Sequence, residues 1–200
     1  MRPLQAQALI EIIQRSLPFQ LLLACLTSPI ALAGQGCRVL DPDIATIYSG
    51  ECASGYAHGR GKAEGKDRYE GMFREGRPHG DGTYVWQSTG SEYVGRFHGG
   101  RPNGQGVYVY GPRSKQSGAR YEGAFVEGLP DGRGRLEFAN GDVYVGMFLK
   151  GERTGRGVYT WANGCRLENT FHRGKPADPS RIRCPPGQRV EVAPEIWTAG

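Results

Sequence analysis

The feature that most constrains this chain is a repeated motif. The pattern Tyr-x-Gly-x-Phe begins at Tyr69, Tyr93, Tyr121 and Tyr144, at intervals of 23 to 28 residues. Each copy carries glycines at its eighth, twelfth and fourteenth positions and an aromatic residue at its eighteenth. Self-similarity at such a period indicates an array of structural repeats, in which each repeat packs mainly on its neighbours.

Each repeat predicts a β-hairpin. In the first full copy Tyr69, Gly71 and Phe73 alternate with the residues at 70, 72 and 74, which is the two-residue period of a half-buried strand. Glu75-Gly76 then predicts a turn, a second alternating run follows, and Asn-Gly or a similar pair ends several repeats. The chain also holds 32 glycines, which disfavour helices.

We therefore expect an all-β fold, an elongated single-layer antiparallel sheet of tandem hairpins with about ten strands. One layer cannot bury both faces, so the aromatic rings should pack on one of them. The glycine two places after each tyrosine is expected to let a neighbouring ring lie flat on the backbone. A third-repeat insertion at residues 111–118 should form a loop on one rim.

The amino terminus predicts export. Basic residues Arg2 and Arg15 precede a short apolar run, and Ala31-Leu32-Ala33 has the form of a cleavage site, so residues 1–33 are interpreted as a signal peptide. The run is shorter than the roughly 20 residues that span a bilayer. An alternative is lipidation at Cys25, and the true start codon is open. The expected location is the periplasm or the extracellular space, with membrane association as a further possibility.

Removal of the leader would leave four cysteines, which allow three pairings. Two of them flank the start of the array and two flank its end, so cross-pairing would require the ends of an extended array to meet. The sequence thus predicts the disulfides Cys37–Cys52 and Cys165–Cys184, which an oxidising compartment would preserve. No spacing typical of a zinc site is present.

The chain divides into four parts on this basis. The signal peptide (1–33) is followed by a cap segment (34–47) and by the repeat array (48–175). Repeats start near 48, 69, 93, 121 and 144, with a partial one at 167, and residues 176–200 form a basic, proline-rich tail. The first repeat has Cys52 where later ones have Phe, as terminal repeats are often atypical.

These residues resemble the MORN repeat (membrane occupation and recognition nexus), whose pattern is Tyr-Glu-Gly-x-Phe followed by spaced glycines and an aromatic residue. The resemblance covers residues 48–175, with departures at Arg135-Leu136, Cys52 and Leu167. It implies an elongated sheet that serves as a binding or dimerisation module. In relatives that are enzymes the catalysis lies in a separate domain, and no such domain is evident in this sequence.

The aromatic residues of the array are the candidate interaction site for a protein or peptide partner, or for a second copy of the chain. Tyr and Trp surfaces with a polar rim suit such contacts. The predicted partner-binding residues are Tyr69, Tyr84, Trp86, Tyr93, Tyr108, Tyr110, Tyr121, Tyr144, Tyr159 and Trp161.

An anionic membrane surface is the alternative partner. The formal net charge is +5, and a basic residue near a charged surface contributes about 1 kcal/mol. The candidate lipid-binding residues are Arg77, Arg101, Arg133, Arg153 and Arg156, together with the basic tail. Basic and acidic residues are interleaved, so a nucleic-acid partner is not expected.

Catalysis is not expected. His58 and His79 occupy the same repeat position but lack further ligands, and Gly59-Arg60-Gly61-Lys62 repeats a hairpin glycine pattern without the helix that a phosphate loop needs. The acidic residues, Asp142 among them, are expected at exposed positions. We therefore predict no enzyme activity, no cofactor, no metal and no small-molecule substrate.

Overall fold

Residues 36–190 are described here from a computed structural model. The chain separates into two units, residues 1–35 and 36–200. The predicted leader, with Cys25, lies outside the described residues, as does the last part of the predicted tail (191–200). No helix within the described part is long and apolar enough to cross a membrane.

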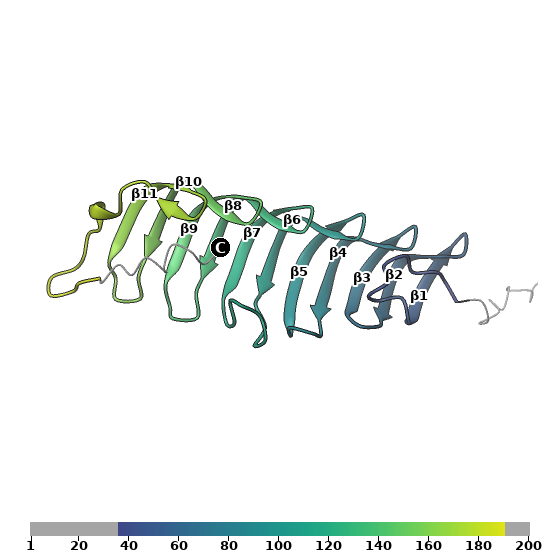
Figure 1. Cartoon of the computed structure of the whole chain (residues 1–200). Helices are drawn as coiled ribbons and strands as arrows, with labels where there is room; N and C mark the ends of the chain where they lie inside the picture. Colours follow the sequence, from purple (N-terminus) through teal and green to yellow (C-terminus); the bar gives the residue numbers. More distant parts are fainter. Residues whose placement is uncertain (1–35, 191–200) are drawn as a thin grey trace, which may run out of the picture. The chain divides into compact units, whose positions relative to one another are not determined.

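A single twelve-stranded antiparallel sheet makes up this unit, and its strands follow one another in chain order (Figure 1). The all-β hairpin array is therefore confirmed, with two strands more than expected. The strands are β1 (Ile47–Ala53), β2 (Tyr56–Glu64), β3 (Arg68–Arg74), β4 (Arg77–Trp86), β5 (Ser91–His98), β6 (Arg101–Val109), β7 (Arg120–Val126), β8 (Leu129–Glu137), β9 (Val143–Leu149), β10 (Glu152–Thr160), β11 (Arg166–His172) and β12 (Lys175–Pro176).

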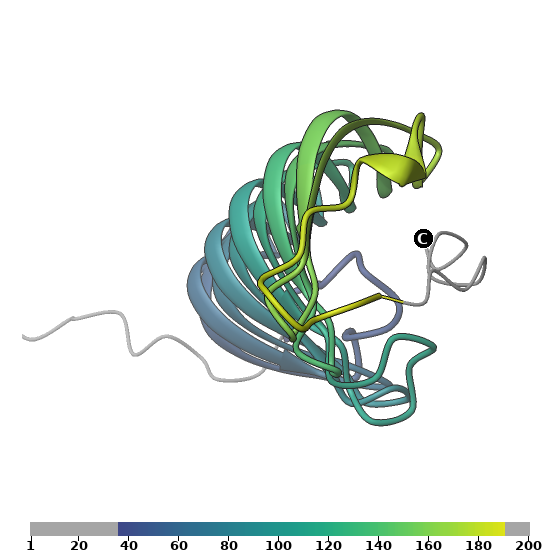
Figure 2. The same cartoon turned by 90° about the vertical axis from the view of Figure 1, so that its left-hand side faces the viewer.

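The sheet curls about its long direction, and Figure 2 shows residues 36–46 and residues 177–190 on its concave side. Ile44 from the first of these segments is fully buried, and Ile182 and Val190 from the second pack against the same core. We call the concave side the inner face and the other side the outer face. The sheet is a single layer, so its buried side chains gather on one side. They form the hydrophobic core on the inner face.

The register places like residues in rows across the strands. Tyr69 pairs with Tyr84, and Gly71 pairs with Gly82. The glycine pair recurs in the three following hairpins, and the tyrosine pair recurs in two of them, because Leu136 replaces the second tyrosine on β8. The ladder then shifts by a β-bulge before Phe73. A bulge leaves part of the backbone without a ladder partner. The Tyr69 hydroxyl donates to the carbonyl oxygen of Met72 at 2.8 Å, so the side chain supplies a hydrogen bond at the bulge.

The paired glycines form a glycine row under the tyrosine rings. A Cβ atom at Gly82 would lie 2.6 Å from Cε2 of Tyr69, and one at Gly71 would strike the Gly82 backbone. The expectation that a neighbouring ring uses this space was wrong in detail: each tyrosine covers the glycines of its own hairpin. At the last hairpin Leu167 replaces tyrosine, and Asn169 stands opposite Gly157 in the glycine row.

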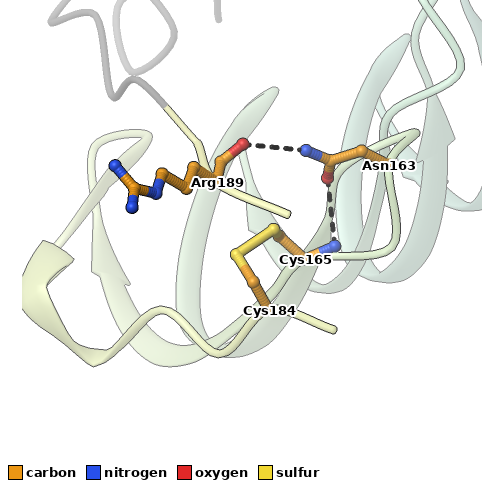
Figure 3. The surroundings of a disulfide bond; sticks show 4 residues. All are labelled: Asn163, Cys165, Cys184 and Arg189. Carbon is orange, nitrogen blue, oxygen red and sulfur yellow. Dashed lines mark hydrogen bonds between the residues drawn. A yellow bond between two sulfur atoms is a disulfide. The ribbon is translucent and has the colours of Figure 1, made fainter. Parts of the chain in front are cut away.

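Two disulfides tie the ends of the unit to the sheet, and the predicted pairing is confirmed. Cys37 is bonded to Cys52 on β1, with Cα atoms 5.8 Å apart. Cys165, just before β11, is bonded to Cys184, with Cα atoms 4.1 Å apart (Figure 3). Next to this bond the Asn163 side chain donates to the carbonyl oxygen of Arg189 at 3.0 Å. The segment after β12 is thereby held against the last hairpin.

Candidate interaction surface

The four repeat tyrosines are buried and serve as packing residues. Each ring stands edge-on to the phenylalanine of its own hairpin and to that of the next: Tyr93 lies 5.1 Å from Phe97 and 4.8 Å from Phe125, between ring centroids. Such edge-to-face pairs stabilise by about 0.5–1.5 kcal/mol beyond their burial. We name this set the tyrosine ladder: Tyr69, Tyr93, Tyr121 and Tyr144 with Phe73, Phe97, Phe125, Phe148 and Phe171.

Burial corrects the predicted role of those tyrosines. Their exposed fractions are 1 % or less, so their rings offer no surface to a partner. The sequence pattern places them on one face but does not tell which rings the neighbouring hairpin covers.

A second group of rings lies on the inner face and is partly open. Trp86 contacts Tyr84 at 4.6 Å and Tyr108 at 5.2 Å between centroids, and Tyr108 contacts Tyr110 at 4.6 Å. Trp86, Tyr108 and Tyr110 are half-buried, whereas Tyr84 is buried. We call these four residues the ring cluster. It spans β4 to β6 and is the largest partly exposed aromatic group of the inner face.

The aromatic row is interrupted at β8, beyond the ring cluster. Leu136 occupies the place that Tyr84, Tyr108 and Tyr159 hold in the other hairpins, and no aromatic contact bridges Tyr110 and Phe138 among the described residues. Beyond the break Tyr159 contacts Phe138 and Trp161, and both Tyr159 and Trp161 are buried. The predicted aromatic row is therefore two groups, of which the second exposes little beyond Phe138.

A shallow cavity of about 380 Å³ lies at this break. The 111–118 insertion forms one wall with Lys115 and Gln116, and Phe138, Asp142 and Tyr159 form the others. The insertion is a series of turns between β6 and β7, as expected. The polar and apolar residues that line the cavity adjoin the partly exposed side chains of the inner face.

Two buried carboxylates fix the connections between hairpins. Asp67 accepts hydrogen bonds from the Tyr84 hydroxyl at 3.1 Å and from the Gln87 backbone N–H at 3.0 Å. Asp142 accepts from the Tyr159 hydroxyl at 2.6 Å and from the Ala162 N–H at 2.9 Å. Asp142 is 5 % exposed, so the expectation that it lies at an exposed position was wrong. Each of the two carboxylates accepts hydrogen bonds from buried donors that water cannot reach.

Sequence reasoning missed these carboxylates, although a signal exists. Asp67 and Asp142 both stand two residues before a repeat tyrosine, and Ser91 occupies the same place. The Ser91 hydroxyl likewise accepts from the backbone N–H of Gly111 at 3.0 Å. Burial, followed by the nearby carboxylates of Asp41 and Asp67, raises the pKa of Tyr84, so this phenol stays a donor at neutral pH.

The predicted lipid-binding arginines do not form one patch. Arg153 is 2 % exposed and stands where Pro78, Pro102 and Pro130 stand in earlier hairpins. Its guanidinium lies between 5.7 and 5.9 Å from the ring centroids of Phe138, Tyr144 and Tyr159, which is cation–π geometry. A membrane surface cannot reach this group. The prediction for Arg153 is thus wrong.

The other four arginines are exposed. Arg133 and Arg156 lie on the outer face, and exposed Met147 pairs with Arg133 across β8 and β9. Arg77 and Arg101 begin β4 and β6 on one rim, where Arg101 forms an ion pair with Glu127 at 2.8 Å.

The histidines do not form a metal site in the described part of the chain. The rings of His79 and His98 lie 5.5 Å apart between centroids and are tilted to each other, and no ring contact joins His79 to His58 among the described residues. Burial, with the charges of Arg74 and His98, lowers the pKa of His79. Within residues 36–190, no three His, Cys, Asp or Glu side chains gather at a distance suited to one ion.

Tyrosine ionisation should unfold the sheet at high pH. Burial raises the pKa of Tyr93, and likewise that of Tyr110 and of Tyr144, from 10.0 to about 12. A folded pKa above the unfolded value means that the folded chain holds these protons more tightly. The stabilisation is therefore complete below pH 10 and is lost as the pH rises through about 12. Thermal unfolding from pH 8 to 12, with tyrosinate absorbance recorded in parallel, checks this; constant stability above pH 10 would contradict it.

Comparison with known proteins agrees with this architecture. Hairpins in chain order, with one ring ladder and one glycine row, define a single-layer β-repeat protein. A family model described as "MORN repeat" matches residues 69–91, 93–114, 121–143 and 144–166. The chain is therefore a MORN-repeat protein, and β1–β2 and β11–β12 extend the same meander beyond the matched repeats.

Other comparisons add less. The TCP domain of SAS-4 (dCPAP) from Drosophila melanogaster, in complex with a proline-rich motif of Ana2 (dSTIL), is 16% identical with a TM-score of 0.32. The similarity covers 57% of this chain and 68% of that chain, and at this TM-score it carries no argument about function. A search of curated proteins gave no match.

Proposed function

We propose that this MORN-repeat protein is an exported, non-enzymatic scaffold for protein–protein interaction or self-association in the cell envelope, and that its inner face binds a protein or peptide segment. The observation that carries the proposal is the ring cluster, in which Trp86, Tyr108 and Tyr110 remain half-exposed. Rigid aromatic rings with a polar rim are the residues that most often dominate binding energy at interfaces. The curled sheet holds them in place without a cost in ordering a loop.

The two disulfides support export, because such bonds persist in oxidising compartments. The predicted signal peptide agrees with that location. Two buried acidic residues of the inner face, Asp67 and Asp142, are already committed to hydrogen bonds. The arrangement therefore favours binding over catalysis.

Truncation of the ring cluster should abolish partner capture. We expect Trp86→Ala with Tyr110→Ala to weaken binding at least ~30-fold, since an aromatic anchor at an interface is worth about 2 kcal/mol or more. Val109→Ala is the matched control, because Val109 precedes Tyr110 directly at the end of β6 and is 41 % exposed on the outer face. Affinity capture from an envelope extract, with crosslinking and mass spectrometry, measures both. Capture that is equal in the three proteins would refute the role of the inner face.

A second candidate function is peripheral binding of anionic lipid headgroups. Exposed Arg133 and Arg156 with Met147 on the outer face favour it, because basic and apolar side chains together suit a membrane surface. Cosedimentation with acidic and neutral vesicles at low and high salt separates the two proposals. Indifference to lipid charge removes this one.

A further inference from the structure

The two edges of the sheet are protected very differently. On β1 the side away from β2 has no hydrogen-bond partner among the backbone groups of residues 36–190, and every residue except Tyr48 is exposed. Ile47 is 63 % exposed. The strand holds no Lys and no Pro, which are the residues that commonly guard an open edge.

The opposite edge is closed by the chain itself. β12 pairs with the end of β11, and Arg166 and Arg183 exchange both backbone hydrogen bonds at 2.8 Å. The Ala177 N–H donates to the carbonyl oxygen of Thr170 at 2.8 Å. The Cys165–Cys184 disulfide, drawn in Figure 3, holds this covering segment in place.

One open edge and one closed edge restrict how copies can assemble. Head-to-tail addition needs two open edges and would continue into a filament, whereas one open edge can pair only with its own equivalent. We infer that β1 pairs antiparallel with β1 of a second copy across a twofold axis. The inference deepens the proposed scaffold role, because self-association is one form of it, and it uses a different surface from the ring cluster.

The charge on β1 does not oppose this pairing. Glu51 is the one carboxylic acid of β1, and its carboxylate accepts a hydrogen bond from the backbone N–H of Arg60 on β2 at 3.0 Å. That contact turns the negative charge toward its own sheet, so two copies of β1 can approach without direct repulsion. The exposed Ile47 side chain would then lose water on pairing.

The expected dimer is weak. A bulge between Gly50 and Cys52 leaves a short regular stretch for pairing. Pairing of one short strand buries less than the roughly 1,200 Å² that stable complexes need. We therefore expect a dissociation constant in the range of about 10 µM to about 1 mM.

Sedimentation equilibrium of the purified, oxidised chain between about 1 µM and about 1 mM tests this. We expect a shift from one copy to two, and no larger species. Ser49→Lys places a charge on the open edge and should weaken the dimer at least ~10-fold. Val109→Lys adds the same charge away from the edge, at a residue that is likewise exposed, and should leave the dimer unchanged.

Three results would overturn the inference: a monomer at every concentration, growth beyond two copies, or equal weakening by both variants. If Ser49→Lys does not fold, amide exchange in the unaltered chain replaces it. Residues 47–53 should then exchange more slowly as concentration rises, while residues 166–172 stay unchanged. The Trp86→Ala, Tyr110→Ala variant should still dimerise, so loss of partner capture and loss of the dimer report on separate surfaces.

Discussion

Gly106→Ala should destabilise the folded sheet by about 3 kcal/mol or more, although the change adds only one methyl group. A Cβ atom at Gly106 would lie 2.5 Å from Cε2 of Tyr93. The ring has no room to retreat, because Phe97 and Phe125 stand against it on both sides and its hydroxyl donates to the Arg96 carbonyl at 3.0 Å. Guanidinium unfolding of the two proteins measures the difference.

A second substitution separates this clash from a general intolerance of the strand. The last hairpin has Leu167 in the tyrosine position and Asn169 in the glycine row, so a side chain is accepted where neither a tyrosine ring nor the second strand of the hairpin covers the row. Tyr93→Leu alone loses the ring contacts and should destabilise. In Tyr93→Leu, Gly106→Ala the alanine should add much less than it does alone, with a coupling free energy of about 1–3 kcal/mol. Additive losses would show that the ring is not what excludes the methyl group.

The sequence predicts the repeat fold because one constraint recurs in every hairpin. Tyr, Gly and Phe at fixed spacing specify a strand, the space for a ring and the ring that meets it. Because each repeat carries the same residues, the interpretation of one repeat can be checked against the next. The disulfides follow from the same regularity, since an extended array keeps the cysteines at its two ends apart.

Exposure is less predictable, because it depends on contacts between repeats. Tyr93 and Tyr108 pair across β5 and β6 and lie on the same face, yet Tyr93 is buried and Tyr108 is half-buried. The difference arises from Phe125 in the next hairpin, which covers Tyr93. The sequence motif gives the face of a residue but not the neighbour that covers it.

Residues that depart from the repeat have environments that their type alone does not predict. Arg153 resembles the other basic residues in sequence, but its register position opposite Phe148 places it among three rings. Leu136 was visible as a departure, and only the structure shows that it divides the aromatic row. In both cases the register, rather than the residue type, decides the environment.

Removal of the Cys165–Cys184 disulfide should have two effects, one on stability and one on assembly. The bond joins residues 19 apart, and closing a loop of this size stabilises by about 3 kcal/mol in the chain-entropy model. Cys165→Ser, Cys184→Ser should lower the free energy of unfolding by about that amount. It should also loosen the segment that covers β11, which opens a second edge and permits head-to-tail addition of copies.

The other disulfide supplies the matched control. Cys37→Ser, Cys52→Ser removes a bond between residues 15 apart, so the loss of stability should be similar, about 3 kcal/mol, but the cover on β11 stays in place. Unfolding curves and sedimentation velocity of both variants make the comparison. Species larger than two copies should form only in Cys165→Ser, Cys184→Ser, where the segment that covers β11 is released. The β1 edge is open in both variants, and one open edge cannot by itself extend a chain of copies. Larger species in both variants, or in neither, would show that the covering segment does not limit assembly.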